Sequence, residues 1–140
     1  NGLIKGDARA FSEKTNTMIE QSMRQLVKGI CDAHGVSYEV KYETTCPMTF
    51  NQPEQAKSAT KAAISLLGPD KCNSDIEPRS FSEDFSIMSK STPGCFVLMG
   101  NGISGSHGRP LHSADYDFND ELLVKGSSYW VELAEQQLKS

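Results

Sequence analysis

The stretch that says most about the fold and the site of this chain is Pro110-Leu111-His112-Ser113-Ala114-Asp115-Tyr116-Asp117-Phe118-Asn119-Asp120. It places a histidine directly before an acid-rich turn, and an apolar pattern with helical spacing follows. A neutral imidazole at a junction between a loop and a helix is a good ligand for zinc, manganese or nickel. Taken by itself, His112 could also be an ordinary surface or packing residue.

The acids after His112 have two interpretations. Asp115, Asp117 and Asp120 could orient the imidazole by hydrogen bonding. Acids at the start of a helix also stabilise it without any role in chemistry, because they cap it and face the positive end of its dipole. We favour this second interpretation for Asp117 and Asp120, and we expect Asp117 or Asn119 to open the last helix.

A second polar cluster, Ser82-Glu83-Asp84-Phe85, precedes this stretch. Ser82 is a plausible cap for a short helix that ends near Ser89. Glu83 either lies near the site or only stabilises this helix terminus, and the residues leave both open. Residues 95–99 read as a fully buried strand, and a loop with four glycines follows it.

The first part of the chain predicts a strand, a helix and a strand. Leu3–Phe11 can form the first strand, and Ser12 and Gly35 are the expected caps of the helix. Val36–Tyr42 alternates apolar and polar residues, as half-buried strands do. We expect the two strands to pair, either antiparallel or parallel, with the helix packed on one face. If both lie in one sheet, the helical connection predicts parallel strands. The helix carries an apolar stripe of Ile19, Met23, Leu26, Ile30 and Ala33.

A break at Cys46–Phe50 is the candidate domain boundary. Asn51 should then cap a second helix, with Glu54 completing a capping box, and Gly68 should end it. Its small residues suggest close packing on a sheet. The whole pattern predicts an α/β fold.

Composition excludes several classes of protein. The chain has 140 residues and a net charge of -4, and no Lys/Arg cluster offsets that charge, so we expect no nucleic-acid or membrane partner. No apolar run approaches the roughly 20 residues of a membrane span, and the first residues do not resemble a signal peptide. Four cysteines without a CxxC pair predict reduced thiols in a cytoplasmic protein.

Together, the Pro-Leu-His stretch, the Ser-Glu-Asp-Phe cluster and the glycine-rich loop resemble the amidohydrolase branch of peptidase family M20, the zinc-dependent aminoacylases and hippurate hydrolases. Gly6-Asp7-Ala8-Arg9-Ala10-Phe11 also matches a Gly-x-x-Arg-x-Phe strand of that family. The resemblance implies that His112 is a metal ligand and that Arg9 and Glu83 lie near the substrate. It implies that residues 1–50 are the second half of a lid, or dimerisation, α/β sandwich. Residues 51–140 would be the C-terminal part of a phosphorylase/hydrolase-like α/β catalytic domain.

The other ligands of the family occur in Cys-Gly-His and Glu-Glu segments, and this sequence contains neither. The resemblance therefore implies no catalytic residue in this chain. It implies a fragment of an enzyme that hydrolyses N-acyl amino acids and that holds zinc, manganese or nickel only when complete. A homodimer is the expected assembly. The alternative is a non-catalytic α/β module that binds a partner or associates with itself.

Overall fold

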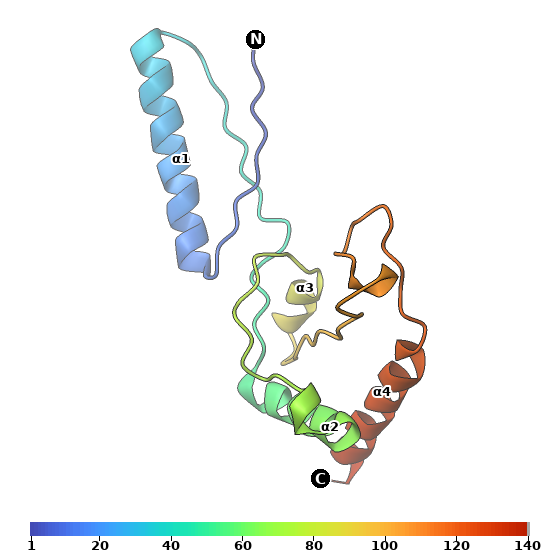
Figure 1. The fold of residues 1–140 in the computed structure, drawn as a ribbon. Helices are drawn as coiled ribbons and strands as arrows, with labels where there is room; N and C mark the ends of the chain where they lie inside the picture. The colour runs from blue at the N-terminus through green and yellow to red at the C-terminus, as the bar shows by residue number, and fades with distance from the viewer. Residues whose placement is uncertain (140) are drawn as a thin grey trace. The chain divides into compact units, whose positions relative to one another are not determined.

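The computed structural model describes residues 1–139. Its elements are α1 (Glu13–His34), α2 (Pro53–Leu67), η1 (Pro69–Lys71), α3 (Phe85–Ser89), η2 (Ser106–Gly108) and α4 (Leu122–Leu138), as labelled in Figure 1. The chain forms two compact units. The first comprises Asn1–Phe50 and Glu77–Thr92, and the second comprises Asn51–Ile76 and the residues from Pro93 on. None of the helices in residues 1–139 has the length and apolar character needed to cross a membrane.

The predicted α/β fold is wrong for the structure, because residues 1–139 contain helices and no strand. The segments expected as strands, Leu3–Phe11, Val36–Tyr42 and 95–99, run as irregular chain. An alternating pattern supplies two different faces, but a strand also needs the backbone of a second strand for its ladder of hydrogen bonds. No such ladder forms among the described residues. The predicted pairing of the two strands and the predicted lid α/β sandwich are therefore wrong for residues 1–139.

Helix α1 begins and ends where its capping residues predict. The Ser12 hydroxyl accepts a hydrogen bond from the Thr15 amide at 3.0 Å. Gly35 adopts a left-handed conformation with φ 64°, and its amide donates to the Asp32 carbonyl. The Val36 amide donates to the Cys31 carbonyl, which completes a Schellman motif. Both capping predictions are confirmed.

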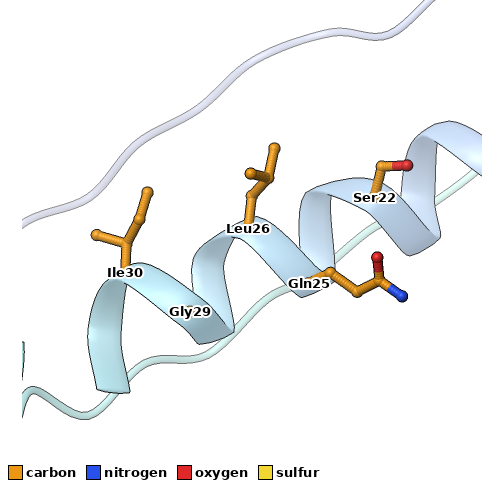
Figure 2. Close-up of a pocket in the computed structure, with 5 residues that line it drawn as sticks. All are labelled: Ser22, Gln25, Leu26, Gly29 and Ile30. Carbon is orange, nitrogen blue, oxygen red and sulfur yellow. The ribbon is translucent and has the colours of Figure 1, made fainter. Parts of the chain in front are cut away.

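The apolar stripe of α1 is not covered in this structure. Leu26 is 65% exposed and Ile30 is 61% exposed, and no residue of α1 is buried. Figure 2 shows both side chains standing out from the same side of the helix, with Ser22 further along and Gly29 between turns. The expected packing of this stripe on a sheet is therefore wrong. An aspartate in place of Ile30 would face solvent here, so Ile30→Asp is not expected to unfold the helix.

Polar contacts hold the segment after α1 along the helix. The Arg24 guanidinium donates to the Val40 carbonyl at 3.1 Å. The Tyr42 hydroxyl donates to Asn16 Oδ1 at 2.6 Å, and Asn16 Nδ2 donates to the Thr44 hydroxyl at 3.0 Å. Side chains of the helix thus hold this segment, one through a backbone carbonyl and the others through side chains, without a partner strand.

The second unit has its core between α2 and α4. Ala62 is fully buried, Ala59 is nearly so, and Tyr129 of α4 is only 6% exposed. The Tyr129 hydroxyl donates to the Ala59 carbonyl at 3.4 Å. Small side chains let the two helices approach closely, so the predicted close packing of α2 is realised against a helix rather than a sheet. The next residue of α4, Trp130, is 64% exposed.

Asn51 does not cap α2, which corrects the predicted capping box. The N-cap position is Gln52, whose side chain makes no capping bond, and Pro53 opens the helix. Asn51 instead pairs with the backbone of Phe96, donating to its carbonyl at 2.9 Å and accepting from its amide at 2.8 Å. The Gln52 amide donates to the Gly94 carbonyl at 3.0 Å. These bonds tie the start of α2 to the segment before the glycine-rich loop.

Candidate functional site

His112 lies at the tip of a loop in the second unit. The Ser113 amide donates to the Pro110 carbonyl at 3.2 Å, so residues 110–113 form a turn. His112 is the third residue of this turn, and its φ is 69°. Among residues 1–139 it is the one non-glycine residue with a positive φ. Such a conformation is unfavourable for a side chain with a Cβ, and it persists where surrounding structure enforces it.

Two ion pairs join the chain on either side of this tip. His107 Nε2 lies 3.3 Å from Asp117 Oδ2, and Arg109 Nε lies 2.9 Å from Asp115 Oδ2. The partners of each pair are equally far from His112 along the sequence, five positions for the first and three for the second. Residues 107–117 therefore fold back on themselves around His112. We call this segment the arm.

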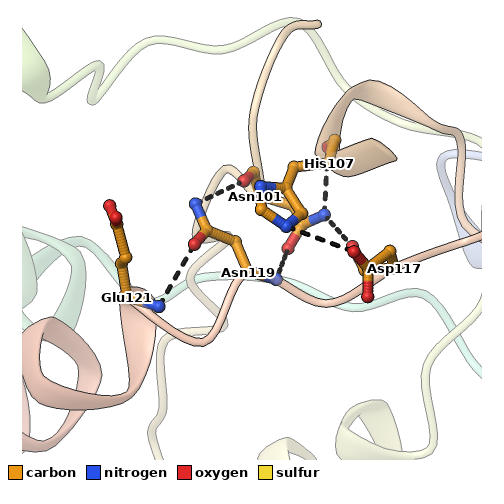
Figure 3. A network of polar contacts seen from close by, with 5 residues as sticks. All are labelled: Asn101, His107, Asp117, Asn119 and Glu121. Atoms are coloured by element: carbon orange, nitrogen blue, oxygen red, sulfur yellow. Dashed lines mark hydrogen bonds and ion pairs between the residues drawn. The ribbon is translucent and has the colours of Figure 1, made fainter. Parts of the chain in front are cut away.

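Asn101 and Asn119 close the base of the arm, as Figure 3 shows. The Asn119 amide donates to Asn101 Oδ1 at 2.8 Å, and Asn119 Nδ2 donates to the Asn101 carbonyl at 3.2 Å. Asn101 Nδ2 donates to two carbonyls, that of His107 at 3.0 Å and that of Asp117 at 2.8 Å. One amide group thus joins both sides of the arm. We call this pair of asparagines the clasp.

The clasp also places the start of α4. Asn119 Oδ1 accepts from the Glu121 amide at 3.1 Å, and the Asn119 carbonyl accepts from the Leu122 amide at 2.9 Å. Asp117 and Asn119 were the residues expected to open this helix, but its N-cap is Glu121, and Asp117 pairs with His107. Asn101 was not found from the sequence. The glycine after it, Gly102, is a hint of a close backbone approach at this place. In the structure, a Cβ at Gly102 would lie 2.8 Å from the His107 Cβ.

Arg9 and the Ser-Glu-Asp-Phe cluster come together in the first unit. Arg9 NH1 donates to the Ser82 hydroxyl at 2.6 Å, and Arg9 Nε pairs with Asp7 at 2.6 Å. Ser82 does not cap a helix, because α3 begins later, at Phe85. The Glu83 carbonyl accepts from the buried Ser86 hydroxyl at 2.6 Å.

The structure thus brings Arg9 to the residue before Glu83. His112 belongs to the other unit. Residues 1–139 contain no sheet on which His112 and Glu83 could share one end. The assignments of Arg9 and Glu83 to substrate and of His112 to metal stay predictions.

The donor set does not by itself form a metal centre. Within residues 1–139 no three His, Cys, Asp or Glu side chains converge at ligand distances. Asp115 and Asp117, expected as possible partners of His112, form ion pairs with Arg109 and His107. His112 can therefore supply one ligand, and further donors must come from outside this set.

Cysteine chemistry is not favoured at Cys95. Burial raises the pKa of the Cys95 thiol, so its thiolate is disfavoured at neutral pH. Burial also raises the pKa of the Tyr129 hydroxyl, and the nearby Cys95 adds to that shift.

The chain is similar to known hydrolases over most of its length. The family described as "Peptidase family M20/M25/M40" matches residues 4–136. "Hippurate hydrolase" of Campylobacter jejuni is 29% identical over 136 residues, which are 97% of this chain and 34% of that protein. "Putative amidohydrolase YhaA" of Bacillus subtilis is 34% identical over 127 residues, covering 87% of this chain and 31% of that protein. "Thermostable carboxypeptidase 2" of Saccharolobus solfataricus is 28% identical over 127 residues, which are 89% of this chain and 31% of that protein. No solved structure is significantly similar to the chain.

The chain is a member of the M20 peptidase family, a family of hydrolases that includes amidohydrolases and metallopeptidases. The family resemblance stated from the sequence is confirmed. The family is generally metal-dependent. The chain spans about a third of the length of the curated relatives it matches.

Proposed function

We propose that this chain is the C-terminal part of a metal-dependent amidohydrolase that hydrolyses the amide bond of N-acyl amino acids. The family match over residues 4–136 supports the hydrolase class. The relative named hippurate hydrolase supports the substrate class, since hippurate is an N-acyl amino acid. The observation that carries the proposal is the forced backbone of His112 at the tip of the arm, because strain of this kind gathers at functional sites.

In this proposal His112 is one metal ligand, and zinc, manganese or nickel is the metal. Arg9 binds the substrate's carboxylate, because a guanidinium can pair with both carboxylate oxygens. Arg9 already pairs with the Asp7 carboxylate through Nε, whereas its NH1 donates to the neutral Ser82 hydroxyl, which a substrate carboxylate could replace as a stronger, charged acceptor. Glu83 lies next to that contact in the sequence and completes the substrate-binding set.

The chain alone is proposed to be inactive. A catalytic zinc usually takes about three protein ligands and keeps one open position, and one histidine cannot supply them. Purified chain should therefore give no metal-dependent release of glycine from hippurate. Hydrolysis that depends on added zinc and that is absent in the His112→Ala chain would overturn this part of the proposal.

The test of the site uses the intact enzyme. His112→Ala should reduce hydrolysis of N-acyl amino acids below detection and should release bound metal, while the far-ultraviolet circular dichroism is unchanged. His34→Ala is the matched control, because His34 is exposed at the end of α1 and should leave turnover normal. Normal turnover in His112→Ala would show that another group is the ligand.

A second candidate is a module that associates with itself without catalysis. The uncovered stripe of α1 favours it, because apolar surface of this extent is typical of an interaction site. The two candidates are compatible if the intact enzyme is a homodimer. Size-exclusion chromatography with light scattering, run on wild-type chain over a range of concentrations, tests for the dimer.

A further inference from the structure

We propose that Asn101 and Asn119 are positioning residues that keep the arm closed and hold His112 at its tip. The sequence pattern offers Asn119 only a role at the start of the last helix and offers Asn101 none, and the family match assigns a role to neither. The inference rests on the proposed function in one respect: the metal-ligand role of His112 is the reason why its position matters. The closure of the arm itself is a separate, measurable property.

The hydrogen bonds of Asn101 support a role in closure. Its Nδ2 donates to the carbonyls of His107 and Asp117, which lie on opposite sides of the arm. Its Oδ1 accepts from the Asn119 amide, and its carbonyl accepts from Asn119 Nδ2. Every hydrogen-bonding group of the Asn101 side chain is thus used inside the loop. Figure 3 shows the asparagines side by side, with His107 and Asp117 next to Asn101.

The ion pairs are weaker candidates for the same role. The side chains of Arg109 and Asp115 are 56% and 63% exposed, and those of His107 and Asp117 are 38% and 60% exposed. Ion pairs in such exposed positions contribute little, because water competes for both charges. Asn101 and Asn119 are half-buried, and each bond that they make to each other or to His107 and Asp117 has a backbone group as one partner. The clasp should therefore dominate the closure of the arm.

The backbone geometry of His112 also supports closure of the arm by the clasp. A residue such as His112 keeps a φ of 69° only when the chain on both sides of it is fixed. If the base of the arm opens, His112 should relax to a negative φ and its ring should leave its place. Loss of the clasp should then act on catalysis through His112, without any contact between the asparagines and the substrate.

The first measurement is amide hydrogen exchange of the intact protein. Asn101→Asp keeps the size and the Oδ acceptor but removes the two donors to His107 and Asp117. Exchange in residues 102–118 should accelerate at least roughly tenfold, while exchange in α2 stays unchanged. Arg109→Gln, which removes one ion pair, should have a smaller effect. Asn73→Asp is the matched control, because Asn73 accepts one local bond from the Asp75 amide.

Unchanged exchange in residues 102–118 of Asn101→Asp would overturn the proposal, as would equal acceleration in α2. A larger effect of Arg109→Gln would also overturn it, because the ion pairs would then close the arm.

The second measurement is the kinetics of the intact enzyme. Asn101→Asp should lower kcat at least roughly tenfold, with KM changed much less, since a positioning residue acts on the reacting geometry rather than on substrate binding. Normal kcat together with an opened arm would overturn the positioning role. The proposed function fails separately, through normal turnover of His112→Ala.

Discussion

Two asparagine side chains in this protein make the bonds that a neighbouring strand makes in a sheet. Asn51 both donates to and accepts from the backbone of Phe96. The Asn101 side chain accepts from the Asn119 amide and donates to the carbonyls of His107 and Asp117. A side-chain amide has the same donor and acceptor as a peptide group, so it can pair with an extended backbone. These bonds satisfy backbone amides and carbonyls that lie outside regular secondary structure.

At the same scale, the strain at His112 predicts an unusual order of stabilities. Glycine adopts a positive φ without cost, whereas alanine does not. We expect the His112→Gly protein to have a free energy of unfolding higher by about 1 kcal/mol than the His112→Ala protein. Urea denaturation of both variants measures the difference. The same pair of substitutions at His34, inside α1, should give the opposite order.

Cys95 should be protected from alkylation and should make stability depend on pH. Burial raises the pKa of its thiol above the ordinary value of 9.0, so the native protein keeps this proton longer than the unfolded chain does. The unfolded chain then binds fewer protons above pH 9.0, and the stability linked to Cys95 falls as pH rises through that range. At pH 8, iodoacetamide should label native Cys95 more slowly than the same thiol in urea. Equal rates, read by mass spectrometry, would contradict this.

At the scale of elements, α1 is a helix held by its ends rather than by a buried face. Its Schellman motif at Gly35 and its cap at Ser12 satisfy the terminal backbone groups, and ion pairs of Glu20 with Arg24 and of Lys28 with Asp32 run along its surface. Most helices gain their stability from packing of an apolar face. In α1 that face is open, so the terminal interactions matter more than usual.

Two glycine substitutions should therefore move the stability of α1 in opposite directions. Gly35 has a φ of 64°, and Gly35→Ala should cost about 1 kcal/mol because alanine is strained there. Gly29 is inside the helix, and a Cβ added there would meet no atom within 4 Å, so Gly29→Ala should stabilise α1 by roughly 1 kcal/mol. Thermal melting followed by circular dichroism at the helix band measures both. A shift of the same sign for both variants would contradict the account.

The elements also show what the sequence can and cannot predict. Ser12 and Gly35 were found from the sequence because their bonds join residues a few positions apart. Asn51 was misassigned because its partner, Phe96, is 45 positions away and competes with a local cap. Val36–Tyr42 has the pattern of a strand, but a pattern does not state whether a partner strand exists. Likewise the motif around His112 predicts a metal ligand, which stays a prediction, whereas the bonds of Asn101 run across the loop and leave no local pattern in the sequence.

At the scale of the whole molecule, a large amount of apolar surface is exposed to solvent. Large apolar side chains are exposed in both units. On α1 they include Met18, Met23, Leu26 and Ile30, and on α4 they include Leu123, Val124, Trp130 and Val131. Monomeric proteins rarely leave so many large apolar residues uncovered. The purified chain should therefore associate as its concentration rises.

Ile30→Asp tests which surface is responsible for that association. Because Ile30 is exposed, the substitution should leave the helix content unchanged and should shift the concentration of half-association upward at least roughly tenfold. Lys14→Gln is the control, since it changes the net charge by the same amount on the opposite side of α1 and should have little effect. Light scattering over a dilution series measures both. Unchanged association in Ile30→Asp would place the contact elsewhere.

The symmetric register of the arm restricts how its length can vary. His107 meets Asp117 and Arg109 meets Asp115 only because both halves of the arm have the same number of residues around His112. One residue inserted on a single side would misalign both pairs and move the tip to a neighbour of the histidine. One residue added on each side would lengthen the arm and leave the histidine at its end. Natural length variation in this loop should therefore come in matched pairs.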